Sequence, residues 1–436
     1  MSRKRKPGER QGHKRNTGNN RTSVLAAVGV AIGLVAGTAA YTLLSRMQMN
    51  RSSLTSISPT MNQATAMTSS PVSSSVPPSV STSPVAPSPI LPFPLPPASK
   101  TATDPNAKLI NISAVGDLIP GSNASGSPLP SEPGEALAQE AQVLFGRIKP
   151  FLGEADITFG NFESTLTNHP YSTKAGLGGA MVAFRTPPVY AQMLKEMGFD
   201  VLSIANNHSY DFGDEGLAET IATIEQNGMK AVGEKEKIVY TKVKGVTIAW
   251  IGYTYFPEHN DMNNLEAAAK LMQEANQNAD LVVISVHAGA EGSDQIYTRD
   301  RTEYLGGENR GNMVQFSRFM IDQGADLILG HGPHVPRALE LYKDRLIAYS
   351  LGNFMGYGTL STYGALGDSM VLQVQMDSQG QFVAGRVLPV ALDRYGIPYL
   401  DDYFQSVILV RNLIKSDFPN TPITLDDMGY IVRTDR

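Results

Sequence analysis

Two histidines stand three positions apart in the segment 330–334, Gly-His-Gly-Pro-His, which follows an apolar run. Glycine and proline favour a tight turn here, so His331 and His334 are expected to lie close together. His208 and His287 also follow apolar runs, and four of the seven histidines of the chain therefore lie at expected strand ends. Because neutral imidazole binds Mn, Fe and Zn, this grouping predicts a metal centre.

Carboxylates and amides follow apolar runs in the same way. These residues are Asp117, Asn161, Glu163, Asn206, Asn207, Asp211 and Glu291. Taken singly, the first three fit an ordinary turn as well as a binding site. The segment 206–211 is harder to explain as a turn, because it contains two amides, an imidazole and a carboxylate. Since open α/β sheets build their ligand sites at the carboxyl ends of strands, we expect these side chains to converge.

The chemistry of such a set is metal-dependent. Imidazole, carboxylate and amide ligands suit a divalent Mn, Fe or Zn ion, and bound ions of this kind activate water for hydrolysis. The chain contains no cysteine, which excludes disulfides, thiolate nucleophiles and cysteine-ligated metals. Hydrolysis also needs a group that donates a proton to the leaving group, and we expect His208 to do so. The sequence therefore predicts a hydrolase-type site.

Short apolar runs that alternate with helix-period segments must position these residues, a pattern typical of βα units and a mainly parallel sheet. The expected strands are 109–115, 157–160, 201–205, 246–253, 281–286 and 327–330. The expected helices include 189–197, 215–227 and 313–323. Near the end of the chain, 369–376 and 382–390 alternate apolar and polar residues around a turn. This alternation predicts a hairpin in a second, antiparallel sheet.

Charge is divided unevenly along the chain. Residues 1–51 contain ten Lys or Arg residues and one Glu, which leaves 26 basic against 40 acidic residues in the remainder. Nucleic-acid binding depends on Lys and Arg that neutralise phosphates, so we expect no nucleic acid as a partner. With 42% hydrophobic and 18% charged residues, the chain as a whole has the composition of a globular protein.

The N-terminal region predicts export. Residues 24–44 form an uncharged apolar run of 21 residues, long enough for one transmembrane helix. Eight Lys or Arg residues precede it in the basic tail 1–23, which the positive-inside rule places in the cytoplasm. A signal peptide cleaved near Ala40 is the alternative. Either arrangement places the remaining chain outside the cytoplasm, and the first predicts a single-pass protein of the cell membrane.

Three further segments complete the organisation. Gly29, Gly33 and Gly37 repeat on one face of the expected helix, which allows a helix-mediated dimer but is also common in membrane helices of every kind. Residues 45–107 are rich in Ser, Thr and Pro and predict a linker without a core. A globular domain is expected over 108–395, followed by a C-terminal extension over 396–436.

The ordered segments of the domain resemble the CapA family of capsule and poly-γ-glutamate synthesis proteins over about residues 108–395. The matching segments are AVGDLIPG, FGNFESTL, DVLSIANNHSYDFGDEGL, VVISVHAGAE, GADLILGHGPHV and LIAYSLGNFMG. The resemblance implies a calcineurin-like metallophosphoesterase fold, an α/β fold of the α+β sandwich type with two packed mixed sheets flanked by helices.

Candidate roles follow from the residues and the resemblance together. The candidate metal ligands are Asp117, Asn161, Glu163, Asn207, His287, His331 and His334. The candidate catalytic residues are His208 and Asp211. The candidate substrate-binding residues are Asn206, Glu291 and Asn353, the last from the family segment SLGNF.

Two positions depart from the wider phosphoesterase pattern of Asp-x-His, Gly-Asp-x-x-Asp, Gly-Asn-His-Asp, His and Gly-His-x-His. Ile119 stands where the first motif has its histidine, and Asn161 is neutral where a bridging aspartate is usual. These departures leave the number of divalent ions open, because one of the two metal positions is expected to be weak or absent.

The resemblance implies a protein that acts in synthesis, export or trimming of an anionic envelope polymer, either poly-γ-glutamate or capsule. Its expected partners are that polymer, the membrane, and membrane proteins of polymer synthesis. Two alternatives stay open, an envelope metallophosphoesterase and a non-catalytic polymer-binding subunit.

Overall fold

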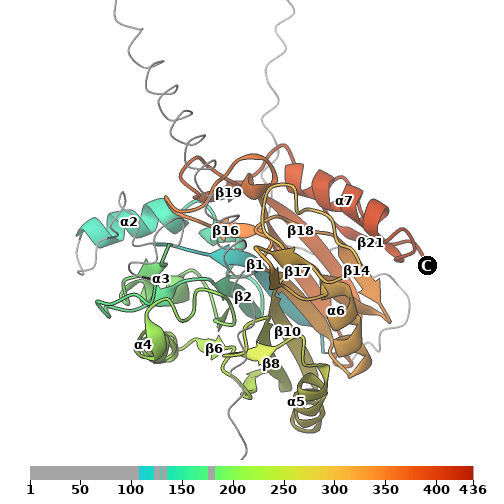
Figure 1. Cartoon of the computed structure of the whole chain (residues 1–436). Helices are drawn as coiled ribbons and strands as arrows, with labels where there is room; N and C mark the ends of the chain where they lie inside the picture. Colours follow the sequence, from blue (N-terminus) through green and yellow to red (C-terminus); the bar gives the residue numbers. More distant parts are fainter. Residues whose placement is uncertain (1–107, 122–128, 130–134, 175–181, 436) are drawn as a thin grey trace, which may run out of the picture. The chain divides into compact units, whose positions relative to one another are not determined.

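The computed structural model describes residues 108–121, 129, 135–174 and 182–435 (Figure 1). The basic tail 1–23, the apolar run 24–44 and the linker 45–107 lie outside these residues. The predicted membrane span and helix-mediated dimer therefore stay predictions. Within the described part of the chain, no helix combines the length and apolar character needed to cross a bilayer.

Eight strands form the first sheet, in the order β19-β18-β17-β1-β2-β5-β6 with β16 beside β1. Its β16, β1, β2, β5 and β6 run parallel, whereas β17, β18 and β19 extend it in antiparallel pairs. The bounds are β1 (Ile110–Leu118), β2 (Ile157–Phe162), β5 (Val201–Ser203), β6 (Lys230–Val232), β16 (Asn353–Met355), β17 (Asp368–Met376), β18 (Phe382–Leu392) and β19 (Pro398–Leu400).

Seven strands form the second sheet, in the order β14-β15-β13-β10-β8-β7 with β9 beside β8. The four central strands β15, β13, β10 and β8 run parallel, and the edge strands β14 and β7 are antiparallel to their neighbours. The bounds are β7 (Val239–Val243), β8 (Val246–Thr254), β9 (Asn260–Asp261), β10 (Leu281–His287), β13 (Leu327–His331), β14 (Leu339–Tyr342) and β15 (Arg345–Ala348).

The two sheets pack face to face on an apolar core. Phe159 of β2 stacks on Trp250 of β8, with ring centroids 5.7 Å apart and an interplanar angle of 5°. Both rings are fully buried, and such a pair contributes about 0.5–1.5 kcal/mol beyond the burial of its area. This contact joins the sheets directly beneath the strand ends that carry the candidate ligands.

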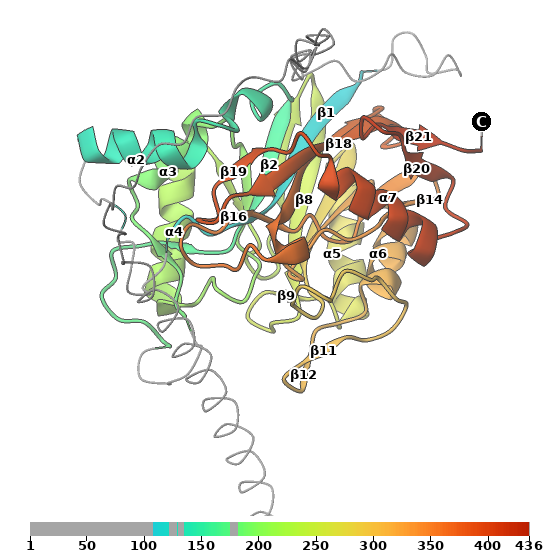
Figure 2. The ribbon, with the colours of Figure 1, turned by 90° about the horizontal axis from the view of Figure 1, so that it is seen from above.

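Helices cover the outer faces of the two sheets (Figure 2). On the first sheet these are α2 (Glu135–Phe145), α3 (Tyr190–Glu196) and α4 (Gly213–Gln226), and on the second α5 (Leu265–Asn278) and α6 (Met313–Asp322). Helix α7 (Gln405–Asp417) packs against β18, β17 and β14. The smaller elements are β3 (Thr165–Leu166), β4 (Arg185–Thr186), β11 (Tyr304–Leu305), β12 (Glu308–Asn309), β20 (Ile423–Leu425), β21 (Ile431–Arg433), η1 (Lys149–Phe151) and η2 (Gly364–Gly367).

The prediction of two packed mixed sheets flanked by helices is confirmed. All six expected strands are present, and the three expected helices correspond to α3, α4 and α6. Five of these strands extend further than predicted, and among them β10 ends at His287 and β13 ends at His331. These histidines are therefore fixed by the sheet itself rather than by the loops that follow.

The predicted hairpin exists, but the sheet assigned to it was wrong. β17 and β18 pair with each other, and β17 also pairs antiparallel with β1, so the hairpin extends the first sheet. Although β17 alternates apolar and polar residues, its polar Ser369 and Gln373 are buried. The residues expected as a C-terminal extension supply β19, α7, β20 and β21, and α7 buries Val407 and Leu413 in the shared core.

Candidate metal centre

Four strand ends, two from each sheet, bring candidate residues together. Asp117 of β1 lies opposite Asn161 of β2 in the first sheet. His287 of β10 lies opposite His331 of β13 in the second. Because the sheets pack face to face, each pair presents its side chains at the same end of the core. The expected convergence of strand ends thus has a geometric origin in the two parallel registers.

Local backbone geometry fixes the side chains of Asp117 and His334. The register of β1 shifts beside Gly116, where an added Cβ would lie 1.8 Å from the carbonyl oxygen of Gly352. The N–H of Asp117 donates to that same oxygen over 3.0 Å. His334 adopts a φ of 62°, a left-handed conformation that costs a residue with a Cβ about 1–2 kcal/mol. The surrounding structure therefore holds His334 in a left-handed conformation that is unfavourable for this residue by itself.

Two fully buried carboxylates form the middle of the centre. One ligand atom each from Asp117, Glu163 and His334 lies within 4.8 Å of the others. Nδ1 of His334 is 3.0 Å from Oδ2 of Asp117 and 3.8 Å from Oε2 of Glu163. Nε2 of His287 lies 3.7 Å from Oε1 of Glu163. Nδ1 of His331 lies 3.7 Å from Oδ1 of Asp117.

Several buried polar atoms here have no hydrogen-bond partner in the protein. They are both carboxylate oxygens of Glu163, Nε2 of His287 and both ring nitrogens of His331. Oδ1 of Asn207, which precedes His208 in the chain, is also buried without such a partner. A buried polar atom left in this state costs about 1–3 kcal/mol. Oxygen and imidazole nitrogen are the donors that Mn, Fe and Zn bind, so the residues fit a divalent cation.

Burial and neighbouring charge set the protonation of the centre. Burial raises the pKa of Glu163 well above its usual value. Burial also opposes ionisation of Asp117, but its hydrogen bond and charge interaction with His334 outweigh this and lower the pKa to about 2. Burial lowers the pKa of His331 to about 4 and that of His287 well below 6.5. These two imidazoles are therefore neutral, which is the form that binds metals.

Two asparagines form a hydrogen-bonded layer under the carboxylates. Nδ2 of Asn161 donates to Oδ1 of Asp117 over 2.8 Å and lies 3.2 Å from Nδ1 of His287. Oδ1 of Asn161 accepts from Nδ2 of Asn206 over 3.2 Å. Oδ1 of Asn206 in turn accepts from the backbone N–H of His208 over 3.1 Å. Asn206, expected to bind substrate, is 1% exposed and bonds to the protein through both ends of its amide.

His208 is held by a carboxylate and a cation, and we call His208, Asp211 and Lys174 the His208 arm. Nδ1 of His208 is 2.8 Å from Oδ2 of Asp211, and Nζ of Lys174 is 2.5 Å from Oδ1 of the same carboxylate. The ring of Phe184 stacks on the imidazole with centroids 4.0 Å apart. Nε2 of His208 consequently points to Oε1 of Glu163, 3.9 Å away. Burial lowers the pKa of His208, so the ring is neutral.

A second set, His334, Glu291 and Arg310, is called the His334 arm. Nε2 of His334 lies 3.9 Å from Oε2 of Glu291, whose Oε1 accepts from Arg310 over 2.7 Å. Arg310 lies over the ring of Tyr255, 4.3 Å from its centroid. Burial opposes protonation of His334, but the carboxylates of the centre raise its pKa to about 10. Oδ1 of Asn353, expected to contact substrate, lies 3.0 Å from Nδ1 of His334.

Comparison with known proteins shows which family this chain belongs to. The sequence matches the family described as "Bacterial capsule synthesis protein PGA_cap" over residues 111–357, more than half of the chain. The chain belongs to this family. A PGA biosynthesis protein CapA from Bacillus subtilis (strain 168) is 31% identical over 296 residues, which cover 63% of this chain and 72% of that protein. A capsule biosynthesis protein CapA from Bacillus anthracis is 31% identical over 49% of this chain and 53% of that protein.

The predicted resemblance to CapA proteins is therefore confirmed, and every candidate site residue of this PGA_cap protein lies inside the matched range. Among solved structures, a putative 5'-nucleotidase from Staphylococcus aureus has a TM-score of 0.37 and 15% identity, covering 70% of this chain and 58% of that chain. Purple acid phosphatase PPD1 from yellow lupin has a TM-score of 0.33 and 9% identity, covering 69% and 55%. Likeness of this degree carries no functional conclusion.

The prediction from strand ends did not include four residues that form part of, or contact, the two arms of the candidate metal centre. They are Lys174, Phe184, Tyr255 and Arg310. Lys174 and Phe184 lie between β2 and α3, and Arg310 follows the short strand β12, so none of these three ends a long apolar run. Their positive charges offer the only local signal for Lys174 and Arg310, and many exposed lysines and arginines share it.

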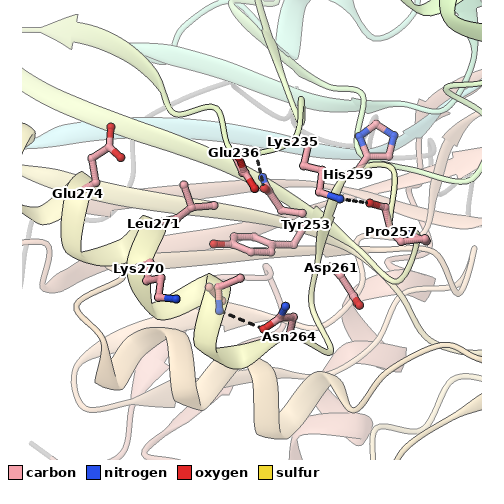
Figure 3. A pocket seen from close by; sticks show the side chains of 13 residues that line it. Lys235, Glu236, Tyr253, Pro257, His259, Asp261, Asn264, Lys270, Leu271 and Glu274 are labelled. Carbon is pink, nitrogen blue, oxygen red and sulfur yellow. Dashed lines mark hydrogen bonds between the residues drawn. The ribbon is translucent and has the colours of Figure 1, made fainter. Parts of the chain in front are cut away.

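A separate groove of about 620 Å³ lies along α5 and β9, as Figure 3 shows. Its lining contains none of the candidate ligands of the PGA_cap centre. It includes His259, whose Nε2 is 2.6 Å from Oγ of Ser209 and whose Nδ1 is 2.6 Å from the carbonyl oxygen of Gly233. Because Ser209 follows His208 in the chain, the groove contacts the segment of the His208 arm without contributing to the metal centre.

Proposed function

We propose that this protein is an accessory factor of poly-γ-glutamate or capsule synthesis that cuts the anionic polymer at a metal-dependent hydrolase-type site. Membership in the PGA_cap family and the names of its CapA relatives support the polymer. One observation supports the chemistry above all. The buried group of Asp117, Glu163 and His334 lies beside the unpaired nitrogens of His287 and His331.

The proposal includes the position of the protein in the cell. The apolar run 24–44 anchors it in the membrane with the basic tail in the cytoplasm, and the linker 45–107 lets the domain reach polymer outside. Membrane proteins of polymer synthesis are its proposed neighbours. The support for this part is the charge and composition of the N-terminal residues.

The chemistry divides between a bound ion and the residues of the chain. A divalent Mn, Fe or Zn ion held by Asp117, Glu163 and His334 would activate water and polarise the bond that is cut. His208 presents Nε2 to the centre because Asp211 and Lys174 hold the other side of its ring. An anionic substrate nearby raises the proton affinity of that nitrogen, and Nε2 then delivers the proton to the leaving group.

The test uses the full-length protein, purified in mild detergent and loaded with Mn²⁺. It is incubated with poly-γ-glutamate of narrow length distribution, and chain length is followed by size-exclusion chromatography. We expect shortening of the polymer, at least about 100-fold slower in His208→Ala because the proton donor is lost. His169→Ala is the matched control, since its ring contacts Tyr171 outside the centre.

The outcomes separate the remaining possibilities. Intact polymer after incubation with the Mn²⁺-loaded protein overturns the hydrolase assignment. Turnover of an aryl phosphate under the same conditions, lost in His208→Ala, assigns a phosphoesterase instead. In a producing strain that lacks the gene, full polymer output with His331→Ala plus His334→Ala excludes the centre from the process.

A further inference from the structure

Buried His259 connects the two sheets beside the His208 arm. It lies between β8 and β9, which pair with each other in the second sheet. Both of its ring nitrogens contact loops of the first sheet. Nδ1 is 2.6 Å from the carbonyl oxygen of Gly233, which follows β6. Nε2 is 2.6 Å from Oγ of Ser209, which follows β5 and comes directly after His208 in the chain. A residue of the second sheet therefore holds the first-sheet segment that carries His208.

These contacts determine where the protons of the His259 ring lie. A carbonyl oxygen only accepts hydrogen bonds, so Nδ1 carries a proton and donates to Gly233. Burial lowers the pKa of His259, so the ring is neutral and Nε2 accepts the hydroxyl proton of Ser209. The ring of Tyr210 contacts the imidazole edge-on, with centroids 5.4 Å apart. The imidazole is thus held on three sides, and both of its nitrogens are bonded to the protein.

The position of Ser209 affects His208 because the two residues are adjacent. Their Cα atoms are about 3.8 Å apart, so a displacement of one residue moves the other. Oγ of Ser209 also lies 2.9 Å from the carbonyl oxygen of Asn206. A serine hydroxyl has one proton, so without an acceptor at His259 it would donate to Asn206 instead. The hydroxyl would then be bonded only within its own segment, and the segment would lose this connection to the second sheet.

We propose that His259 is a positioning residue, which acts through Ser209 to hold His208 in place for proton transfer. The inference rests on the proposed function, in which His208 gives a proton to the leaving group. Nε2 of His208 lies 3.9 Å from Oε1 of Glu163 in the centre. A misplacement of about 1 Å lowers the rate of a catalysed reaction about 100-fold, so a small movement of this segment has a large effect.

The test compares two amides that each reproduce one side of the imidazole. In His259→Gln the longer side chain places its amide near the position of Nε2 and keeps a bond to Ser209. In His259→Asn the shorter side chain reaches only the position of Nδ1 and keeps the bond to Gly233. Cleavage of poly-γ-glutamate by the full-length, Mn²⁺-loaded protein gives kcat and KM. We expect His259→Asn and Ser209→Ala to lower kcat about 10- to 100-fold with little change in KM, and His259→Gln to stay within about 3-fold of the wild type.

A nuclear magnetic resonance measurement on the same proteins needs no substrate. The ring of Phe184 stacks on His208 with centroids 4.0 Å apart, so its ring current shifts the ring-proton signals of His208. The protein is labelled at histidine, and the signals are assigned from His208→Ala. We expect them to move in His259→Asn and Ser209→Ala but not in His259→Gln. Tyr253→Phe is the matched control, because Tyr253 lines the same groove as His259 (Figure 3) and its buried hydroxyl has no hydrogen-bond partner in the protein.

The outcomes separate this proposal from the proposed function. Equal losses of kcat in His259→Gln and His259→Asn, or unmoved His208 signals in Ser209→Ala, overturn the positioning role. Wild-type kcat in His259→Asn and Ser209→Ala also overturns it and leaves the proposed function standing. Movement of the His208 signals in a protein that leaves the polymer intact supports the connection between His259 and His208 and refutes the proposed function alone. Circular dichroism checks the fold of each variant, and Ser209→Ala decides if the His259 variants do not fold.

Discussion

The His208 arm and the His334 arm each consist of an imidazole, a carboxylate beside it and a cation beside the carboxylate. The two arms differ in the distance between the imidazole nitrogen and the carboxylate oxygen. In the His208 arm the imidazole lies 2.8 Å from its carboxylate, and the lysine lies 2.5 Å from that carboxylate. In the His334 arm the imidazole lies 3.9 Å from its carboxylate, which the arginine holds at 2.7 Å. One imidazole is thus bonded to its carboxylate, and the other is only near it.

This difference shows which of the two histidines interacts directly with the buried carboxylates Asp117 and Glu163. Nδ1 of His334 contacts Asp117 directly, and charge interactions in the centre raise its pKa to about 10. Burial lowers the pKa of His208, whose nearest carboxylate of the centre, Glu163, is 3.9 Å away. These contacts favour the proposed role of His334 as an ion ligand and the proposed role of His208 as the group that gives a proton to substrate.

The largest expected effect comes from removing each imidazole. His334→Ala removes a ligand and is expected to lower the affinity for Mn²⁺ by more than about 100-fold, whereas His208→Ala lowers it less than about 10-fold. Isothermal titration of the EDTA-treated full-length protein with Mn²⁺ measures both. Equal losses in the two variants would show that the arms have the same role.

A smaller effect is expected when the cations are removed. Arg310→Met frees Glu291 and is expected to weaken Mn²⁺ binding about 10-fold through His334. Lys174→Met leaves Mn²⁺ binding nearly unchanged, but lowers the free energy of unfolding by about 1–3 kcal/mol because Oδ1 of buried Asp211 loses its ion pair with the lysine. Titration and urea unfolding separate these outcomes. Weaker metal binding in Lys174→Met would contradict the division between the arms.

The smallest expected effect is on the pH dependence of stability in the metal-free protein. The raised pKa of His334 contributes stability below pH 6.5 that is lost as the pH rises to about 10. The lowered pKa of His208 makes stability fall as the pH drops below 6.5. In EDTA, His334→Gln should therefore flatten the alkaline decline, and His208→Gln the acid decline. Urea unfolding between pH 5 and 10 measures both slopes, and unchanged slopes would contradict the assignment.

Local patterns predicted the strands and the residues at their ends, because both depend on short runs of sequence. His287 and His331 were found in this way, and they lie opposite each other in β10 and β13. The hairpin of β17 and β18 was also found, but pairing of β17 with β1 joins segments more than 250 residues apart and leaves no local trace. The cations of the two arms were missed for a related reason, since their partners are set by the packing of loops.

The separation of the ligands along the chain has a consequence for folding. Asp117 and His334 are 217 residues apart, and β7, β8, β9, β10 and β13, which form most of the second sheet, lie between them in sequence. No single segment holds a complete ligand set, so the set exists only after both sheets have docked. Energy of binding to the proposed metal centre would then be gained by the native state alone, and Mn²⁺ at 100 times its dissociation constant would add about 2.7 kcal/mol to the free energy of unfolding. Metal uptake during refolding would report the last step of assembly.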